Sequence, residues 1–181
     1  MLKTFRMINN SLSNYISQLQ LLAFFAGYPL IYTLVNFLAT ERLKEKPLLS
    51  KKWIALLPFA YALVGTLFIG LLLKNISPDF SVKNIAEQFS TPYLEVWGTL
   101  AVLFWIPALS KKPVFSLLHS LPFFFILLKD FMQISISGRF VIENDMKMYT
   151  ISLLLHTGAL VVMFAISYGL HHFRIRRNTA H

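Results

Sequence analysis

The sequence contains no cysteine, and it is poor in charged residues. The absence of cysteine from its 181 residues excludes disulfides, thiolate metal sites and cysteine redox chemistry. Only 14% of the residues are charged, against 56% that are hydrophobic, a balance typical of a polytopic membrane protein. A Walker loop, a Gly-x-Gly-x-x-Gly turn, a nucleophile elbow and a His-Glu-x-x-His pair are also missing. We therefore expect neither a cofactor nor a bound metal.

Five long apolar stretches fill most of the chain. A helix that crosses a bilayer needs about 20 mostly apolar residues, and a soluble chain of this size would not carry five runs near that length. We predict an all-α membrane protein, a bundle of five transmembrane helices forming one domain over residues 17–171. The predicted spans cover about residues 17–39, 53–73, 92–110, 113–132 and 148–170.

Three segments outside the spans have patterns of their own. Residues 1–16 carry apolar side chains at helical spacing, which predicts an amphipathic segment lying on the membrane; a frayed extension of the first span is the alternative. Residues 74–92 predict a second, shorter amphipathic helix. Residues 134–142 alternate apolar with small or polar residues around Gly138, which predicts a small hairpin or a re-entrant segment.

A short motif occurs twice. Leu-Ser-Lys-Lys at residues 49–52 recurs at residues 109–112, and each copy is followed by Leu-Pro-Phe. The recurrence predicts two tandem helical hairpins plus one helix, as parallel repeats in transporters have; chance identity among common residues is the alternative. Three prolines inside the predicted spans are expected to kink them: Pro29, Pro58 and Pro122.

The positions of the charged residues, which give a net charge of +9, follow the predicted membrane topology. Basic residues gather at helix ends, so nucleic acid is not an expected partner. The loops at residues 40–52 and 109–112, with the tail, carry ten Lys and Arg against two Glu. The positive-inside rule therefore places the C-terminus in the cytoplasm and the N-terminus outside, and the short loops favour a bacterial inner membrane. Residues 172–181 form a basic tail whose arginines are expected to contact anionic lipid headgroups: Arg174, Arg176 and Arg177.

Charged residues border the third and fourth spans. The uncharged cores of these spans are short, so either the bilayer thins locally or Glu95, Lys129 and Asp130 lie within the outer edge of the hydrocarbon layer. Counting from the turn between the two antiparallel helices puts Glu95 and Lys129 at similar depth. This predicts an ion pair between them, extended by Asp130. An interfacial pair in which Lys129 snorkels outward is the alternative.

Two histidines lie inside predicted spans. His119 and His156 differ in depth by roughly 10 Å at 1.5 Å per residue, too far for one shared metal ion. Each is expected to be a hydrogen-bonded packing residue. His156 is also a candidate proton acceptor for the Glu95–Lys129 cluster.

Three functions remain open. The favoured one is a non-catalytic multi-pass membrane protein that acts as an accessory subunit, assembly factor or sensor, with lipids, other membrane proteins or its own copies as partners. A small oligomeric transporter or channel is the first alternative, and a continuous polar path would favour it. A lipid-modifying enzyme is the second, with Glu95, His156 and Asp130 as outer-face acid and base. A dry, packed bundle with an exposed apolar face would favour the accessory role.

Overall fold

The computed structural model describes residues 15–41, 47–77, 92–137 and 140–178. Every regular element in these four ranges is a helix, so the predicted all-α class is confirmed. The interfacial helices predicted at residues 1–16 and 74–92 fall largely outside the described residues.

Seven labelled helices follow an N-terminal helix formed by residues 15–25. They are α2 (Tyr28–Glu41), α3 (Pro47–Ile76), α5 (Pro92–Thr99), the 3-10 helix η1 (Leu100–Trp105), α6 (Pro107–Ser110), α7 (Pro113–Ser137) and α8 (Phe140–Asn178).

Within the four described ranges, four helical stretches are long and apolar enough to cross a membrane, which identifies the chain as an integral membrane protein. They run over Tyr15–Glu41, Lys51–Ile76, Pro113–Met132 and Glu143–Leu170, and four of the predicted spans fall inside them. The remaining apolar helix, Tyr93–Trp105, is shorter. It corresponds to the predicted span 92–110.

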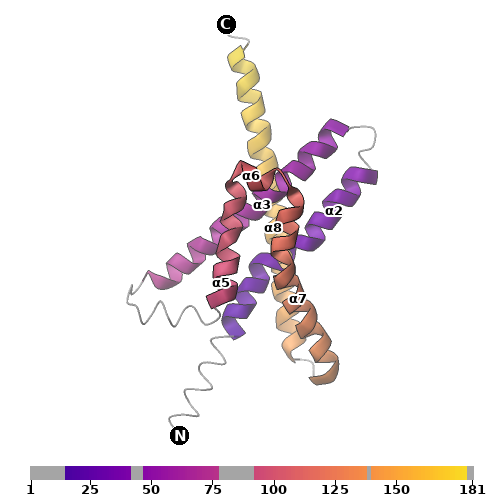
Figure 1. The fold of residues 1–181 in the computed structure, drawn as a ribbon, viewed down its shortest axis with the longest axis vertical. Coiled ribbons are helices and arrows are strands. Elements are labelled where there is room, and N and C mark those ends of the chain that lie inside the picture. Colours follow the sequence, from indigo (N-terminus) through magenta and orange to yellow (C-terminus); the bar gives the residue numbers. More distant parts are fainter. Residues whose placement is uncertain (1–14, 42–46, 78–91, 138–139, 179–181) are drawn as a thin grey trace.

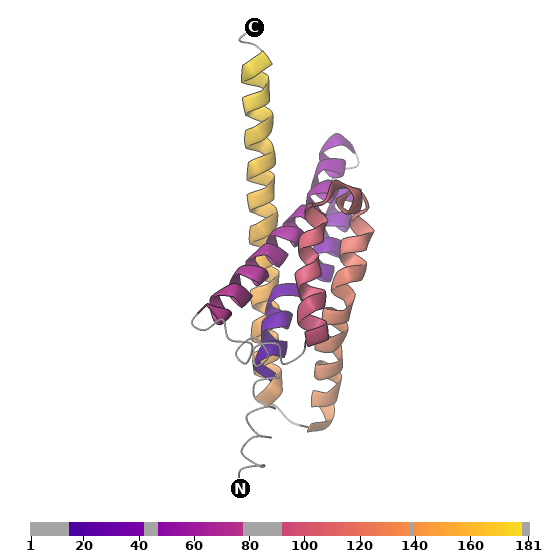
Figure 2. The same cartoon turned by 60° about the vertical axis from the view of Figure 1, so that its left-hand side comes forward.

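The helices form an elongated bundle with two distinct ends. The start of the N-terminal helix, the end of α3, the start of α5, the end of α7 and the start of α8 lie at one end, here called the Asp130 end (Figure 1). Helix α6 lies across the opposite end, here called the Lys111 end. Helix α8 is the longest element, and its C-terminal part stands clear of the other helices in both views (Figures 1 and 2).

The third span is not one continuous α-helix. α5 tightens into η1 after Thr99, and the backbone becomes extended at Ile106, with φ −74° and ψ 123°. Pro107 is the cause, because proline disfavours the helical conformation in the residue before it and is well tolerated in the first turn of the next helix. Residues 106–112 therefore run across the Lys111 end instead of along the bundle (Figure 2).

The proline-containing spans differ from one another. The first span breaks at residues 26–27 and resumes as α2, with Pro29 as its second residue. The Gly27 N–H donates to Ser152 Oγ of α8 at 2.9 Å, which satisfies a backbone donor at the break. Pro58 and Pro122 lie inside α3 and α7, which stay helical through them; their kinks remain predictions.

Two glycines allow neighbouring helices to touch. A Cβ atom on Gly27 would lie 2.8 Å from the Leu153 backbone nitrogen of α8, and one on Gly65 would lie 2.7 Å from Ala101 Cβ of η1. Real Cβ atoms do not approach so closely, so any larger residue would push the helices apart. Small residues serve this purpose in membrane bundles generally.

Aromatic rings fill the centre of the bundle. Phe25 stacks on Phe123 with ring centroids 4.7 Å apart and meets Phe68 edge-on at 5.2 Å. Tyr28 and Tyr61 lie next to this group at 4.3 Å from each other. All five side chains are 0–1% exposed.

Two other sequence expectations change. The prediction of a hairpin or re-entrant segment at residues 134–142 is wrong, since α7 continues to Ser137 and α8 begins at Phe140. The basic segment after residue 171 continues α8 as far as Asn178. The two hairpins proposed as repeats are unlike in detail, because the second pairs the shorter α5–η1 with α7; the repeat remains a prediction.

Candidate functional site

Polar side chains meet at mid-depth around Tyr61. Ser116 Oγ donates to the Pro113 carbonyl at 2.6 Å, so its bond of 2.7 Å to Tyr28 must be donated by the tyrosine hydroxyl, since a serine has one proton to give. The Tyr61 hydroxyl is hydrogen-bonded to His119 Nδ1 at 2.8 Å. The cluster joins the first span, α3 and α7.

The two span histidines lie on either side of the Tyr61 ring. The His119 and His156 rings are 5.6 and 6.0 Å from it. His156 Nδ1 lies 2.9 Å from the Ser152 carbonyl oxygen, which only accepts, so Nδ1 carries the proton. Both histidines are thus hydrogen-bonded and packed among aromatic rings. The Nε2 atom of each is buried without a hydrogen-bond partner among the described residues.

Trp97 of α5 covers His119. The indole and imidazole rings are stacked at 4.8 Å with an interplanar angle of 8°, and Trp97 Nε1 donates to the His119 carbonyl at 2.9 Å. Pro122 has no N–H to bond to the Leu118 carbonyl, so the bond from Trp97 lies next to a backbone bond that α7 lacks. Trp97 therefore fixes α5 at the level of His119.

A second polar group lies at the Asp130 end. Gln18 Nε2 donates to Asp130 Oδ2 at 2.6 Å, and the carboxyl groups of Asp130 and Asp145 interact electrostatically. Asp145 is only 4% exposed, and its Oδ2 atom has no hydrogen-bond partner in the described part of the chain. Two carboxyl groups thus interact where α7 and α8 meet the N-terminal helix.

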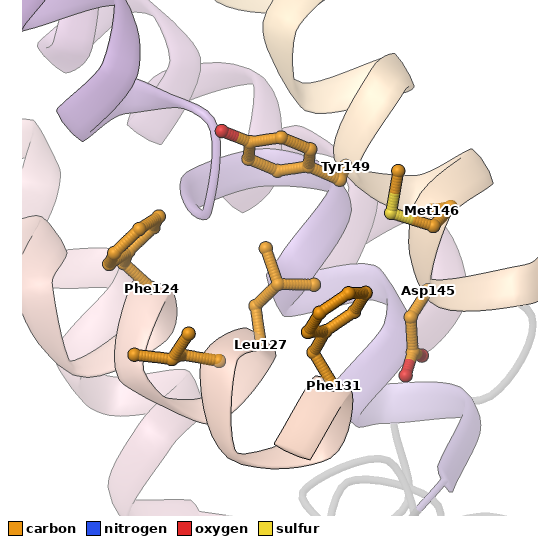
Figure 3. A pocket seen from close by; sticks show the side chains of 7 residues that line it. Phe124, Leu127, Phe131, Asp145, Met146 and Tyr149 are labelled. Atoms are coloured by element: carbon orange, nitrogen blue, oxygen red, sulfur yellow. The ribbon is translucent and has the colours of Figure 1, made fainter. Parts of the chain in front are cut away.

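An apolar cavity adjoins Asp145. Its volume is about 140 Å³, and Figure 3 shows its walls, with Phe124, Leu127 and Phe131 on α7 facing Met146 and Tyr149 on α8. Asp145 contributes the charged group to this otherwise apolar surface. The arrangement has room for an apolar group of modest size beside a carboxylate.

Aromatic packing separates the two polar groups. Along the first span, Phe25 lies between Gln18 and Tyr28; along α7, Phe123 lies between His119 and Asp130. These two phenylalanines stack on one another. Between the first span and α7, the described side chains at this level are therefore packed rings.

The structure places Glu95 and Lys129 in different surroundings. Glu95 is 2% exposed on α5, whereas Lys129 is exposed on α7. The stacked rings of Trp97 and His119 lie at the same level along the bundle. Measured along the helices from that level, Glu95 lies about 3 Å and Lys129 about 15 Å toward the Asp130 end. The counting from the turn fails because residues 106–112 run across the bundle. The ion pair remains a prediction that this 12 Å difference in level does not favour.

The remaining predicted acid–base residues are spread along the bundle. Asp130 interacts with Asp145, while His156 lies eleven residues farther along α8, or about 16 Å. No group of three or more His, Asp or Glu suited to a metal ion occurs among the described residues. An enzyme site made of Glu95, His156 and Asp130 remains a prediction. The side chains of Arg174, Arg176 and Arg177 lie outside the described part of the structure.

The sequence carried an overlooked signal for part of this site. Polar residues occur along α8 at spacings of four, three and four, which places them on one helix face: Asp145, Tyr149, Ser152 and His156. Asp145 lies outside the predicted span 148–170, so the length of the apolar run alone does not reveal this register. Tyr28, Tyr61 and Gln18 gave no comparable signal.

Comparisons with known proteins add no family to this description. The chain matches no protein-family model, no curated protein and no solved structure. The class defined by fold and site is an all-α integral membrane protein with a filled aromatic core and, at one end, a buried Asp145 that interacts with the half-buried Asp130.

Proposed function

We propose that this protein is a non-catalytic accessory subunit or assembly factor of a larger membrane complex, which it contacts through α8. The observation that carries the proposal is the part of α8 that extends beyond its own bundle. Trp53 of α3 stacks on Phe164 at 5.0 Å; past that contact, residues 165–178 continue for roughly 21 Å. A helix that leaves its own bundle offers a surface to another protein.

The exposed face of α8 is apolar and contains small residues. Ile166, Tyr168 and Leu170 are 49%, 67% and 65% exposed. Gly158 and Gly169 have nothing within 4 Å of where a Cβ atom would lie, and the exposed Ala165 falls on the same face. Lipid favours bulky side chains on such a face, whereas close helix contacts require small ones. This composition supports a partner helix.

The interior supports a structural role. The polar groups around Tyr61 bond to one another or to the backbone. Along the first span and α7, the stacked rings of Phe25 and Phe123 lie between these groups and the Asp130 end. The most apolar window of each long span is buried to a different extent. The buried share is 56% in Tyr15–Glu41 and 50% in Lys51–Ile76, against 22% in Pro113–Met132 and 28% in Glu143–Leu170. The first two spans thus form a core, and α7 and α8 are left open to neighbours.

The proposed location is a bacterial inner membrane with the Lys111 end in the cytoplasm. Lys51, Lys52, Lys111 and Lys112 lie at that end, from which α8 also extends. Asp130 and Asp145 lie at the other. The positive-inside rule favours this orientation, which leaves the N-terminus outside.

Gentle purification of the tagged full-length protein from its native membranes, with mass spectrometry of what accompanies it, tests the proposal. We expect a stoichiometric protein partner. Gly158→Leu and Gly169→Leu should each reduce the recovered partner about tenfold, equivalent to about 1.4 kcal/mol of lost contact. Gly70→Leu is the matched control, because Gly70 on α3 also has nothing within 4 Å, and it should keep the partner.

Two results would contradict this proposal. A homo-oligomer or monomer that carries only lipid would remove the accessory role. A partner retained at full yield by both α8 variants would keep the role but assign the contact to another helix.

A further inference from the structure

A second pocket lies at the Lys111 end, where the two copies of Leu-Ser-Lys-Lys come together. It has a volume of about 560 Å³ and lies between the first turns of α3 and the α6–α7 turn. Lys51 from the first copy and Lys111 from the second both line it. The motif that suggested a repeat thus contributes one lysine from each copy to one site.

The break in the third span explains why the pocket is there. η1 packs directly onto α3 at Gly65, and the Trp105 ring still lies 6.1 Å from Phe59. At Ile106 the backbone becomes extended, and α6 turns away across the bundle. The first turns of α3 are therefore left without a neighbour on this side.

The lining combines positive charge with an apolar wall. Lys51 and Lys111 are exposed, and no acidic residue lines the pocket. Ile54 and Phe59 of α3 and Pro107 of α6 form the wall. Phe59 lies eight residues past Lys51, about 12 Å farther into the bilayer. Charge at the mouth and hydrocarbon below match the order of groups in a phospholipid.

The pocket also lies at the boundary of the membrane. Lys51 is the first residue of its apolar span, and Lys111 separates the apolar stretches Tyr93–Trp105 and Pro113–Met132. Headgroup phosphates lie at this level. The neighbouring Lys112 is placed differently, with its Nζ 5.5 Å from the centre of the Phe115 ring.

We infer that this pocket binds one anionic phospholipid, with the phosphate between Lys51 and Lys111 and an acyl chain along Ile54 and Phe59. Ammonium groups attract phosphate as point charges, and the apolar wall holds the chain. The inference rests on the membrane location alone and is independent of the proposed contact through α8.

Native mass spectrometry of the delipidated full-length protein, titrated with phosphatidylglycerol or with phosphatidylcholine of the same chains, tests this site. We expect the first phosphatidylglycerol to bind more tightly than phosphatidylcholine. Lys51→Gln combined with Lys111→Gln should weaken phosphatidylglycerol binding about tenfold or more, since a lysine near an anionic surface contributes roughly fivefold. Lys52→Gln combined with Lys112→Gln removes the same charge and should change it by no more than about twofold.

Three results would overturn the inference. These are no preference for phosphatidylglycerol in the unaltered protein, equal weakening by both pairs of substitutions, and displacement of the lipid by equimolar inorganic phosphate. The first would remove anionic selectivity, the second would assign it to overall charge, and the third would assign the pocket to a free anion. All four lysines are exposed, so the variants should keep the unfolding temperature of the parent, which is measured alongside.

Discussion

Replacement of Gly65 by alanine should separate η1 from α3. The new Cβ atom would lie 2.7 Å from Ala101 Cβ and 3.1 Å from two backbone atoms of η1. Backbone atoms cannot rotate away as a flexible side chain does. The helices would have to part by at least 0.7 Å to restore a contact of 3.4 Å, and the close packing on either side would loosen.

The expected loss follows from two opposing effects. Overpacking a tight contact costs about 1–3 kcal/mol, while alanine favours a helix over glycine by about 1 kcal/mol. Gly65→Ala should therefore lower the free energy of unfolding by up to roughly 2 kcal/mol. Gly70, five residues farther along α3, has nothing within 4 Å, so Gly70→Ala should leave stability unchanged or raise it by up to about 1 kcal/mol.

The free energy of unfolding is best measured in bicelles by steric trapping, with helix content followed as a check on folding. A second substitution sharpens the experiment. Ala101→Gly removes the atom at 2.7 Å but leaves the backbone atoms at 3.1 Å, so it should restore part of the stability lost in Gly65→Ala. Equal stability of the Gly65→Ala and Gly70→Ala variants, or no recovery in the double variant, would refute the packing argument.

Three further substitutions test the polar groups by the same measurement. Tyr61→Phe removes the hydrogen bond to His119 and should cost about 1 kcal/mol; a stability equal to that of the parent would contradict the bond. Asp145→Asn should raise stability by about 1 kcal/mol, because it removes a buried charge that interacts with Asp130. Gln18→Leu should lower stability by about 1 kcal/mol through loss of its bond to Asp130. A change of opposite sign in either of the last two would show that the acidic pair is arranged otherwise.

The number and position of the apolar helices were predictable from the sequence because the length of a span is fixed by the bilayer. Four predicted spans fall inside long apolar helices. The third corresponds to a shorter apolar helix, which ends at one dipeptide, Ile106-Pro107. A proline after an apolar residue indicates a helix boundary, but the apolar run continues past it. Counting residues from the turn therefore does not give the levels of Glu95 and Lys129, and their ion pair stays a prediction.

The site was less predictable because the composition of a helix does not determine which of its faces points into the bundle. α3 is apolar on nearly all sides, so no stripe indicates which of its faces is inward. His119 and His156 were singled out as ionisable groups in spans, and their packing role agrees with their surroundings. Their neighbour Tyr61 was not identified, since tyrosine is common in membrane helices and its partner comes from α7, 58 residues away.

The short third span constrains how the protein is made. α5 and η1 together rise only roughly 24 Å, and they carry the buried Glu95. A span this short, with a carboxyl group buried near its start, is less stable in lipid alone than the longer spans are. α3 is synthesised before it and offers the Gly65 surface; α7 follows directly and supplies the His119 surface on which Trp97 stacks. Biogenesis must therefore retain the third span at the insertion machinery until its neighbours are beside it.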